Sequence, residues 1–287
     1  MDIKEKMIEK SLLLIALSSI SVLALIAFFI FGEGLPLIWK IGPKAFLFGE
    51  RWVPSKGEFG ILPMIIGSFW VTFGALLLGI PLGLACSIFL CEWAPPLAGT
   101  LLRPAIQLLA AIPSVIYGFW GLVVLVPLVR NHLGGPGLSI LSGSVILGFM
   151  ILPTIISISE DSLNAVPNAY VEASLAMGAS RWQTLVRVKI PAALSGIIAA
   201  FMLGMGRAIG ETMTVLMATG NARTFPHGLL QSLRTMTSNI AIELGEVPYY
   251  TTHYYALFAI GLVLFLMTFL VNLVADVVLR KYQEREQ

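Results

Sequence analysis

One charged, helix-prone stretch interrupts an otherwise apolar chain: Glu172-Ala-Ser-Leu-Ala-Met-Gly178-Ala-Ser-Arg-Trp-Gln-Thr-Leu-Val-Arg-Val-Lys-Ile-Pro191. Its local pattern predicts two short helices. Pro167 can occupy the first helical position, where its missing N–H leaves no hydrogen bond unmade. Gly178 can provide the left-handed residue that ends this helix. Ser180 and Gln183 then form a capping-box pattern that opens the second helix.

The composition around this stretch indicates a membrane protein. Hydrophobic residues make up 57% of the chain, charged residues 12%, and the mean hydropathy is +0.88, which excludes an ordinary soluble domain. The net charge of +2 is too small to suggest a nucleic-acid partner. The two cysteines, Cys86 and Cys91, lie in one apolar segment, which favours inert thiols over a disulfide. No group of His, Cys, Asp and Glu has metal-ligand spacing, so we predict neither a metal nor a cofactor.

The apolar runs predict an all-α membrane bundle of six transmembrane helices. A bilayer core roughly 30 Å thick needs about 20 apolar residues per helix. The runs that meet this need are Leu12–Phe31, Ile61–Leu90, Pro104–Val129, Ile140–Ser159, Ala192–Ala218 and Tyr254–Leu279. The first run is longer than a signal-peptide core and no small-residue cleavage site follows it, so we expect this helix to be retained.

An even number of spans places both termini on one side of the membrane. Three lysines precede the first span, and the positive-inside rule assigns this side to the cytoplasm. Two long segments then lie outside, Gly32–Gly60 and Gly220–Thr252, and the second contains a helix-like piece at residues 228–236. The tyrosines that follow this piece have two interpretations, an interfacial belt or a landing surface for an external binding protein.

Several predicted spans carry prolines and small residues. Interior prolines kink transmembrane helices, and the four of interest are Pro81, Pro113, Pro127 and Pro153. Glycines four residues apart, Gly79 with Gly83 and Gly206 with Gly210, allow neighbouring helices to approach closely. Together these features indicate a bundle that packs tightly and can rock.

Two charged residues, Arg207 and Glu211, fall inside the predicted fifth span. Burying one such charge in a membrane helix costs roughly 2.5–3.5 kcal/mol on insertion scales. The four-residue spacing would stack the two side chains on one helical face, where they partly neutralise each other. Two interpretations remain: a structural ion pair that holds the bundle, or a transport pathway. In a pathway, the arginine would favour an anion.

The stretch from Glu172 to Pro191 resembles the EAA loop of ABC importer permeases. In that family the loop is the cytoplasmic element that docks into a groove on the ATPase subunit. The residues that match the pattern are Glu172, Ala173, Gly178 and Pro191, and the conservative departures are Ser174, Val188 and Ile190. The resemblance implies an ATPase-docking loop at 167–191 that uses Glu172, Ala173, Ser174 and Gly178.

Longer motifs resemble the permeases of bacterial phosphate ABC importers. They are Arg207-Ala-Ile-Gly-Glu-Thr-Met, Ala111-Ile-Pro-Ser-Val-Ile-Tyr-Gly-Phe-Trp-Gly and Val166-Pro-Asn-Ala-Tyr-Val-Glu-Ala-Ser. The Gly-Glu-Thr-Met motif with the later Gly220-Asn resembles the PstC-type subunit, and the sister PstA-type permease is the nearest alternative. This resemblance implies a type I importer (MetI-like) bundle in which Arg207 and Glu211 line the phosphate pathway. Nothing carries over to Gly32–Gly60.

The same resemblance implies a division of the chain at residue 60. Residues 1–60 would form an amino-terminal segment, the first transmembrane helix and an outer loop. Residues 61–287 would form a five-helix permease core with its ATPase-docking loop at 160–190.

The chain itself lacks the means to hydrolyse ATP. It has no Gly-x-x-x-x-Gly-Lys-Ser/Thr motif and no Gly-Lys dipeptide, so we predict that it is not an enzyme and that hydrolysis belongs to a partner. The predicted function is one half of an ATP-driven pathway for inorganic phosphate in the bacterial inner membrane, with both termini cytoplasmic. The implied partners are a PstA-type permease, two ATPase copies, a periplasmic phosphate-binding protein and membrane lipid. The alternatives are a permease for sulfate, molybdate or phosphonate, and an ion-coupled secondary carrier, which would not need the docking stretch.

Overall fold

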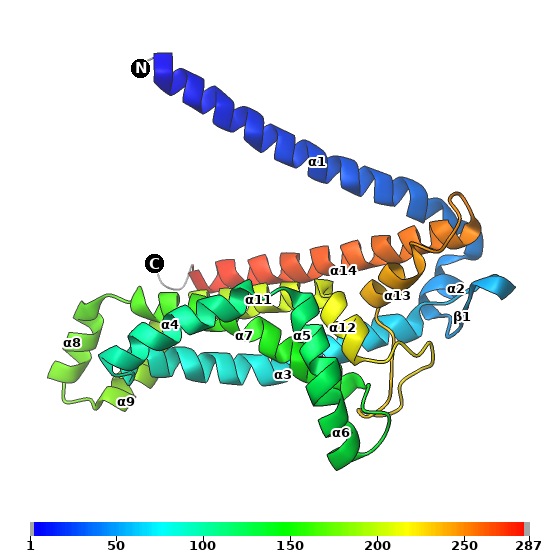
Figure 1. The fold of residues 1–287 in the computed structure, drawn as a ribbon. Helices are drawn as coiled ribbons and strands as arrows, with labels where there is room; N and C mark the ends of the chain where they lie inside the picture. The colour runs from blue at the N-terminus through cyan, green and yellow to red at the C-terminus, as the bar shows by residue number, and fades with distance from the viewer. Residues whose placement is uncertain (1–2, 284–287) are drawn as a thin grey trace.

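The computed structural model describes residues 3–283, which fold almost entirely into helices (Figure 1). Four helices in this part of the chain hold 25 residues or more: α1 (Ile3–Ile41), α3 (Leu62–Glu92), α7 (Ile140–Asn164) and α14 (Thr252–Gln283). The shorter ones are α2 (Pro43–Phe48), α4 (Pro96–Ala111), α5 (Ser114–Trp120), α6 (Val126–Leu133), α8 (Asn168–Ala176), α9 (Arg181–Thr184), α10 (Ile190–Ala192), α11 (Leu194–Gly210), α12 (Met213–Ala218) and α13 (Met236–Glu243). Two short strands, β1 (Trp52–Val53) and β2 (Glu58–Phe59), form an antiparallel hairpin.

Five described segments are long and apolar enough to cross a membrane. They are Met7–Ile41 of α1, the whole of α3, the continuous helical run Ser114–Leu133, the whole of α7 and Thr252–Val277 of α14. A sixth span arises if the two pieces Arg181–Ala192 and Leu194–Gly210, which meet at a bend of 68°, cross together. The predicted all-α membrane bundle is therefore confirmed, with its fifth span bent.

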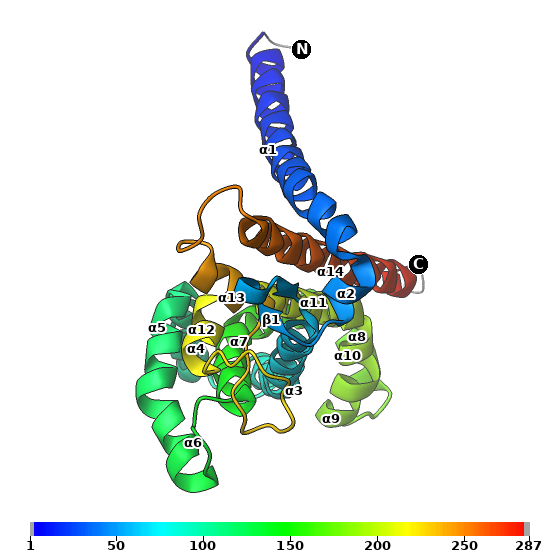
Figure 2. The ribbon, with the colours of Figure 1, turned by 90° about the vertical axis from the view of Figure 1, so that its right-hand side faces the viewer.

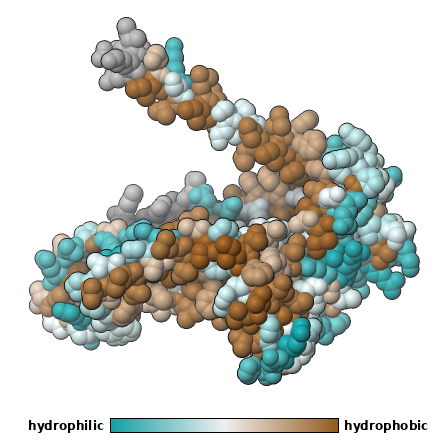
Figure 3. Space-filling model, viewed as in Figure 1, coloured by the Kyte–Doolittle hydropathy of each residue, from teal (hydrophilic) through white to brown (hydrophobic). Residues whose placement is uncertain are grey.

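Helices α3, α7 and α14 run in roughly one direction, so the molecule has two distinct ends (Figure 1). The hairpin, α2 and α13 lie at one end, and α8 and α9 lie at the other, together with the start of α1 and the end of α14. Helix α1 leaves the body of the molecule in both views (Figure 2). Hydrophilic residues gather at the two ends and hydrophobic residues cover the middle (Figure 3), as expected for a bundle that spans a bilayer.

Helices α3 and α7 pack closely because glycines of α3 face α7. A Cβ at Gly79 would lie 3.0 Å from the Ile151 side chain, and one at Gly83 would lie 2.6 Å from Cγ2 of Ile155. Both isoleucines are fully buried. The predicted role of this glycine pair in close helix packing is confirmed. By contrast, a Cβ at Gly206 would lie 3.7 Å from Oδ1 of Asn272, an ordinary contact, and a Cβ at Gly210 would meet no other segment within 4 Å among the described residues, so this pair makes no comparably close approach there.

The predicted third span is wrong at its start. Residues 96–111 form a separate helix, α4, and the crossing segment begins only at Ser114. Proline disfavours the helical conformation of the residue before it, and Ile112 is accordingly extended, with φ −65° and ψ 127°. Pro113 therefore separates two helices rather than kinking one.

The outer segments also differ from the predictions. Helix α1 continues beyond Phe31 to Ile41, because tertiary packing on α14 outweighs the local helix-breaking residues. At Gly34 the approach is so close that a Cβ would lie 2.9 Å from the main-chain oxygen of Phe258. Residues 228–235 form turns and an isolated bridge, so the helix-like piece predicted at 228–236 is wrong, and α13 begins at Met236.

Candidate functional site

The fifth span is broken at Glu211. Helix α11 ends at Gly210, Glu211 is extended with φ −70° and ψ 131°, and the six-residue helix α12 begins at Met213. The side chains of Arg207 and Glu211 consequently form no ion pair in the part of the chain that the structure describes. The prediction that they stack on one face of a continuous helix is wrong, because the helix ends before Glu211.

Arg207 lies in the last turn of α11, where the negative end of the helix dipole favours a cation. Its Nη1 donates a 3.1 Å hydrogen bond to Oγ1 of Thr154 in α7. The residue is exposed. Most of the donor groups of this arginine are therefore free to bind an external acceptor.

Glu211 is held by both its side chain and its main chain. Its Oε1 accepts a 3.1 Å hydrogen bond from the amide of Thr214 and so caps the start of α12. Its main-chain oxygen accepts a 2.9 Å hydrogen bond from Oγ1 of Thr237 in α13. A cavity of about 10 Å³ beside it is lined partly by hydroxyl groups, namely those of Ser68, Thr72, Thr235 and Thr237. The break is therefore a polar, hydrogen-bonded element inside an apolar bundle.

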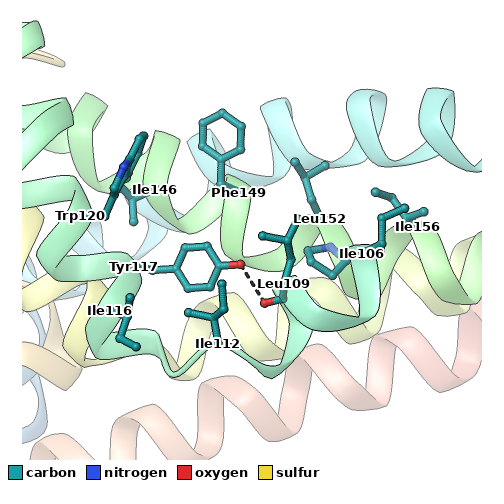
Figure 4. A pocket seen from close by; sticks show the side chains of 11 residues that line it. Ile106, Leu109, Ile112, Ile116, Tyr117, Trp120, Ile146, Phe149, Leu152 and Ile156 are labelled. Atoms are coloured by element: carbon teal, nitrogen blue, oxygen red, sulfur yellow. Dashed lines mark hydrogen bonds between the residues drawn. The ribbon is translucent and has the colours of Figure 1, made fainter. Parts of the chain in front are cut away.

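A much larger cavity, of about 360 Å³, lies between α4, α5 and α7 (Figure 4). Its lining is apolar apart from Tyr117, whose hydroxyl donates a 2.9 Å hydrogen bond to the main-chain oxygen of Leu109. Neither Arg207 nor Glu211 lines it. A charged ligand would lose its hydration in this cavity without compensation, so the cavity suits apolar contacts rather than an anion.

The charged stretch forms the two short helices that were predicted. Gly178 has φ +85°, and Ser180 with Gln183 forms a complete capping box at the start of α9. Pro167 lies one position before the first helical residue of α8, rather than at it. The hydroxyls of Ser174 and Thr184 are 2.9 Å apart and join α8 to α9. This arrangement gives the segment a fixed shape.

The surface of this segment exposes large apolar side chains. Met177 is 88% exposed, and the others that are exposed are Tyr170, Leu175 and Trp182. Glu172 and Ala173 are exposed on the same helix α8, whereas Ser174 is half-buried. Lys189 forms an ion pair with Glu92, which ties the stretch to the end of α3. Exposed apolar patches of this kind, rimmed by polar groups, are typical of protein interaction sites.

Two polar clusters were not predicted from the sequence. At the α8 end, Arg103 of α4 donates a 2.6 Å hydrogen bond to buried Glu160 of α7, and this bond raises the pKa of the Arg103 guanidinium further. At the hairpin end, buried Glu243 contacts groups from several segments, including Trp52, 191 residues away. Contacts over such separations leave no spacing signal in a single sequence.

These features define a multi-pass membrane transport subunit: a broken span that presents an arginine, and a rigid exposed segment at one end. The chain belongs to the family described as "Binding-protein-dependent transport system inner membrane component", which matches residues 79–284. Family membership confirms the predicted class of importer permease.

Curated relatives show which importer permeases the chain resembles. The protein named "Probable ABC transporter permease protein YqgH" from Bacillus subtilis is 41% identical over 89% of this chain and 84% of its own length. The "Phosphate transport system permease protein PstC" from Mesorhizobium japonicum is 36% identical over 84% of this chain and 80% of its own length. The predicted resemblance to PstC-type permeases is thus confirmed.

Solved structures support the fold. An inward-facing structure of the MetNI methionine ABC transporter matches with a TM-score of 0.60 at 20% identity, over 81% of this chain and 99% of the matched chain. A bacterial alginate ABC transporter matches with the same TM-score at 16% identity, over 96% of both chains. The predicted type I importer fold is confirmed by these likenesses.

Proposed function

We propose that this chain is the PstC-type permease subunit of an ATP-driven importer of inorganic phosphate, and that Arg207 and Glu211 line the phosphate pathway. The observation that carries the proposal is Arg207 at the end of α11, exposed and without a carboxylate partner among the described residues. A guanidinium presents several donors in a planar fork, which matches the oxygens of phosphate. The relatives named as phosphate permeases support this substrate over other oxyanions.

We assign the two charges at the break different tasks. Near neutral pH inorganic phosphate still carries a proton, whereas sulfate carries none. Arg207 donates to the anion's oxygens. An ionised Glu211 carboxylate only accepts hydrogen bonds, so it can receive the phosphate O–H but repels the bare oxygens of sulfate. Oε1 accepts one hydrogen bond, from the amide of Thr214, so the carboxylate keeps acceptor sites for the substrate.

The energy source belongs to a partner in this proposal. The fixed shape of α8 and α9 and their exposed apolar side chains support an ATPase-docking role for residues 167–191, with Glu172, Ala173, Ser174 and Gly178 at the contact. An ion-coupled carrier would have no use for such a surface. We therefore propose that two ATPase copies drive the importer, and that this chain contributes transport but no hydrolysis.

A second permease, of the PstA type, completes the pathway. The apolar cavity between α4, α5 and α7 and the exposed apolar side chains of α4 support a protein partner or lipid on this face. A periplasmic phosphate-binding protein would deliver the anion at the hairpin end. Residues 1–60 serve as an amino-terminal addition to the five-helix core, residues 61–287.

The test of this function is transport by the reconstituted complex. We expect proteoliposomes that hold this chain, its partner permease, the ATPase and the binding protein to accumulate labelled phosphate when ATP is supplied. Glu211→Gln should relax selectivity: leak of sulfate relative to phosphate through the open complex should rise about tenfold, the effect of losing roughly 1.4 kcal/mol of discrimination. Glu246→Gln removes an exposed outer carboxylate and serves as the matched control.

Two results would contradict the proposal. Accumulation of sulfate without phosphate by the unaltered complex would refute phosphate as the substrate. An unchanged ratio of sulfate to phosphate leak in Glu211→Gln would refute the discriminating role of Glu211 and leave the substrate assignment standing.

The same proposal places both termini and residues 167–191 in the cytoplasm. Arg181 and Gln231 are both exposed. Arg181 begins α9, and Gln231 belongs to the segment between α12 and α13; these parts of the chain lie towards opposite ends of the bundle (Figure 1). In a background with Cys86 and Cys91 replaced, Gln231→Cys should react with an impermeant maleimide on intact cells, and Arg181→Cys only after the cells are opened. Reaction of both cysteines on intact cells would contradict this orientation.

A further inference from the structure

The hairpin end of the molecule is organised around one buried carboxylate. We call this region the outer cap: the hairpin at residues 52–59, the loop at 219–235, α13 and the first turn of α14. Glu243, the last residue of α13, is 5% exposed. Its carboxylate contacts the hairpin, the loop and the first turn of α14. Moving any one of these parts away from α13 would therefore break a contact with Glu243.

Each oxygen of Glu243 has two partners. Oε1 lies 2.8 Å from Nη1 of Arg234 and 2.9 Å from Nη2 of Arg223. Oε2 accepts a 2.9 Å hydrogen bond from Nε1 of Trp52 and lies 2.8 Å from Nε2 of His253. A carboxylate offers about four lone-pair sites, and all four are used here. Two arginines on one carboxylate leave this cluster with excess positive charge, so Glu243 is the group that makes their approach possible.

Arg234 links this carboxylate to the start of the same helix. It comes directly before Thr235, the N-cap of α13, and its Nη1 reaches forward along the helix to Oδ1 of Asn239, at 3.0 Å, and to Glu243. Burial lowers the pKa of Arg234, the charge of Arg223 lowers it further, and Glu243 opposes both. Both ends of α13 are thus held by one ion pair.

The start of α13 in turn holds the helix break. Thr235 accepts a hydrogen bond from the amide of Ser238, and its hydroxyl is 3.1 Å from that of Thr237. Thr237 donates to the main-chain oxygen of Glu211 at 2.9 Å. The Met236 amide donates to Oγ of Ser68 at 3.1 Å, which fixes α13 against α3. A continuous set of contacts therefore connects Glu243 to the break beside Arg207.

We propose that Glu243 is a positioning residue for transport. Its carboxylate holds the other parts of the outer cap against α13. Helix α13 in turn sets the conformation of the broken span through the hydrogen bond from Thr237 to the main-chain oxygen of Glu211. The proposal rests on the proposed function, in which this break lies on the substrate pathway. Glu243 touches neither Arg207 nor Glu211 and acts only through α13. An eight-residue helix has little stability of its own, so its position depends on how its ends are held.

The test places a reporter at the break. In the assembled complex, with Cys86 and Cys91 replaced, Thr212→Cys provides a half-buried thiol beside Glu211. We expect Glu243→Gln to raise its rate of modification by a charged maleimide by about fivefold, the effect of losing one typical hydrogen bond at the break. Thr237→Val should raise the rate similarly, and the two changes together should add little to either alone, because they act on one contact. Both variants should also slow phosphate uptake per complex.

Controls separate positioning from general damage. Glu246→Gln removes an exposed carboxylate three residues away, and Thr237→Ser keeps the hydroxyl, so both should label like the parent. A second reporter, Glu9→Cys in the first turns of α1 and outside the proposed docking surface, should label at the parent rate in every variant. If Glu243→Gln fails to assemble because Arg234 is left buried and uncompensated, Thr237→Val carries the test.

Different results would contradict the positioning role of Glu243 and the proposed function of the chain. Unchanged labelling at position 212 in Thr237→Val and Glu243→Gln overturns the positioning role. Faster labelling with normal phosphate uptake also overturns it, because the contact would then be structural only. If the parent complex transports no phosphate, the proposed function fails, and labelling alone decides whether Glu243 sets the break.

Discussion

Replacement of Arg207 by glutamine is expected to reduce ATP-driven phosphate uptake by about one to two orders of magnitude. A hydrogen bond to a charged group contributes about 1.5–3 kcal/mol, which corresponds to a factor of roughly 10 to 150. The substitution removes the guanidinium that the proposed function assigns to phosphate binding and leaves a neutral amide. Uptake of labelled phosphate by proteoliposomes that hold the complete complex measures this effect.

The structure predicts that Arg207→Gln leaves the bundle intact. The side chain is exposed, and its one described hydrogen bond goes to Thr154. The variant should therefore co-purify with the ATPase subunit, and the assembled complex should hydrolyse ATP as the parent complex does. Arg51→Gln is the matched control: it removes an exposed arginine that is distant from Arg207 in the sequence, and it should transport phosphate normally. Arg207→Lys keeps the charge and loses the planar fork, so its uptake should lie between those of the parent and of Arg207→Gln.

The alternative of a structural ion pair gives a different pattern. Because Arg207 pairs with neither Glu211 nor another carboxylate among the described residues, removing the arginine breaks no ion pair in that part of the chain. Loss of uptake with normal assembly would thus support a direct role in the pathway. Normal uptake by Arg207→Gln would contradict it, whatever its effect on stability.

Local features of the fold could be predicted from the sequence because they depend on residues that are close together. Apolar runs of about 20 residues identify spans without knowledge of their neighbours. The capping box at Ser180 and Gln183 and the left-handed turn at Gly178 likewise depend on a few adjacent residues. Close packing by Gly79 and Gly83 was predictable as a tendency, although the sequence did not identify α7 as the helix they face.

Features that depend on distant contacts could not be predicted. The extension of α1 to Ile41 follows from packing on α14, more than 200 residues later. At the break, the main-chain oxygen of Glu211 accepts a hydrogen bond from Thr237, 26 residues away. A local signal did exist there, since Gly210 can end one helix and Thr212 can precede the next, and it could have been used. Glu243 carried no signal of its own, because its four partners are spread over three other segments of the chain.

The second large effect is expected from Gly178→Val, which should weaken binding of the ATPase subunit that supplies the energy for transport. Gly178 has φ +85° between α8 and α9, and its amide and that of Ala179 close the turn on Leu175 and Ser174. A β-branched residue resists positive φ, and holding it there costs about 1–3 kcal/mol. The segment then either bears this strain or turns differently, and a different turn would move α9 relative to α8.

A docking surface built from two helices requires their mutual orientation. We therefore expect Gly178→Val to insert normally, but to recover about tenfold less ATPase subunit on purification, which corresponds to roughly 1.4 kcal/mol of lost binding. Apart from its immediate chain neighbours, no described residue has an atom within 4 Å of a Cβ added at this glycine, so the effect arises from the backbone and not from a clash. Gly178→Asn adds a side chain that tolerates the left-handed conformation, and it should bind the ATPase almost as the parent does. Equal recovery of the ATPase by the valine and asparagine variants, together with full uptake, would contradict the docking role. Loss of binding in the valine variant alone would instead identify the turn at Gly178 as the element that fixes the contact.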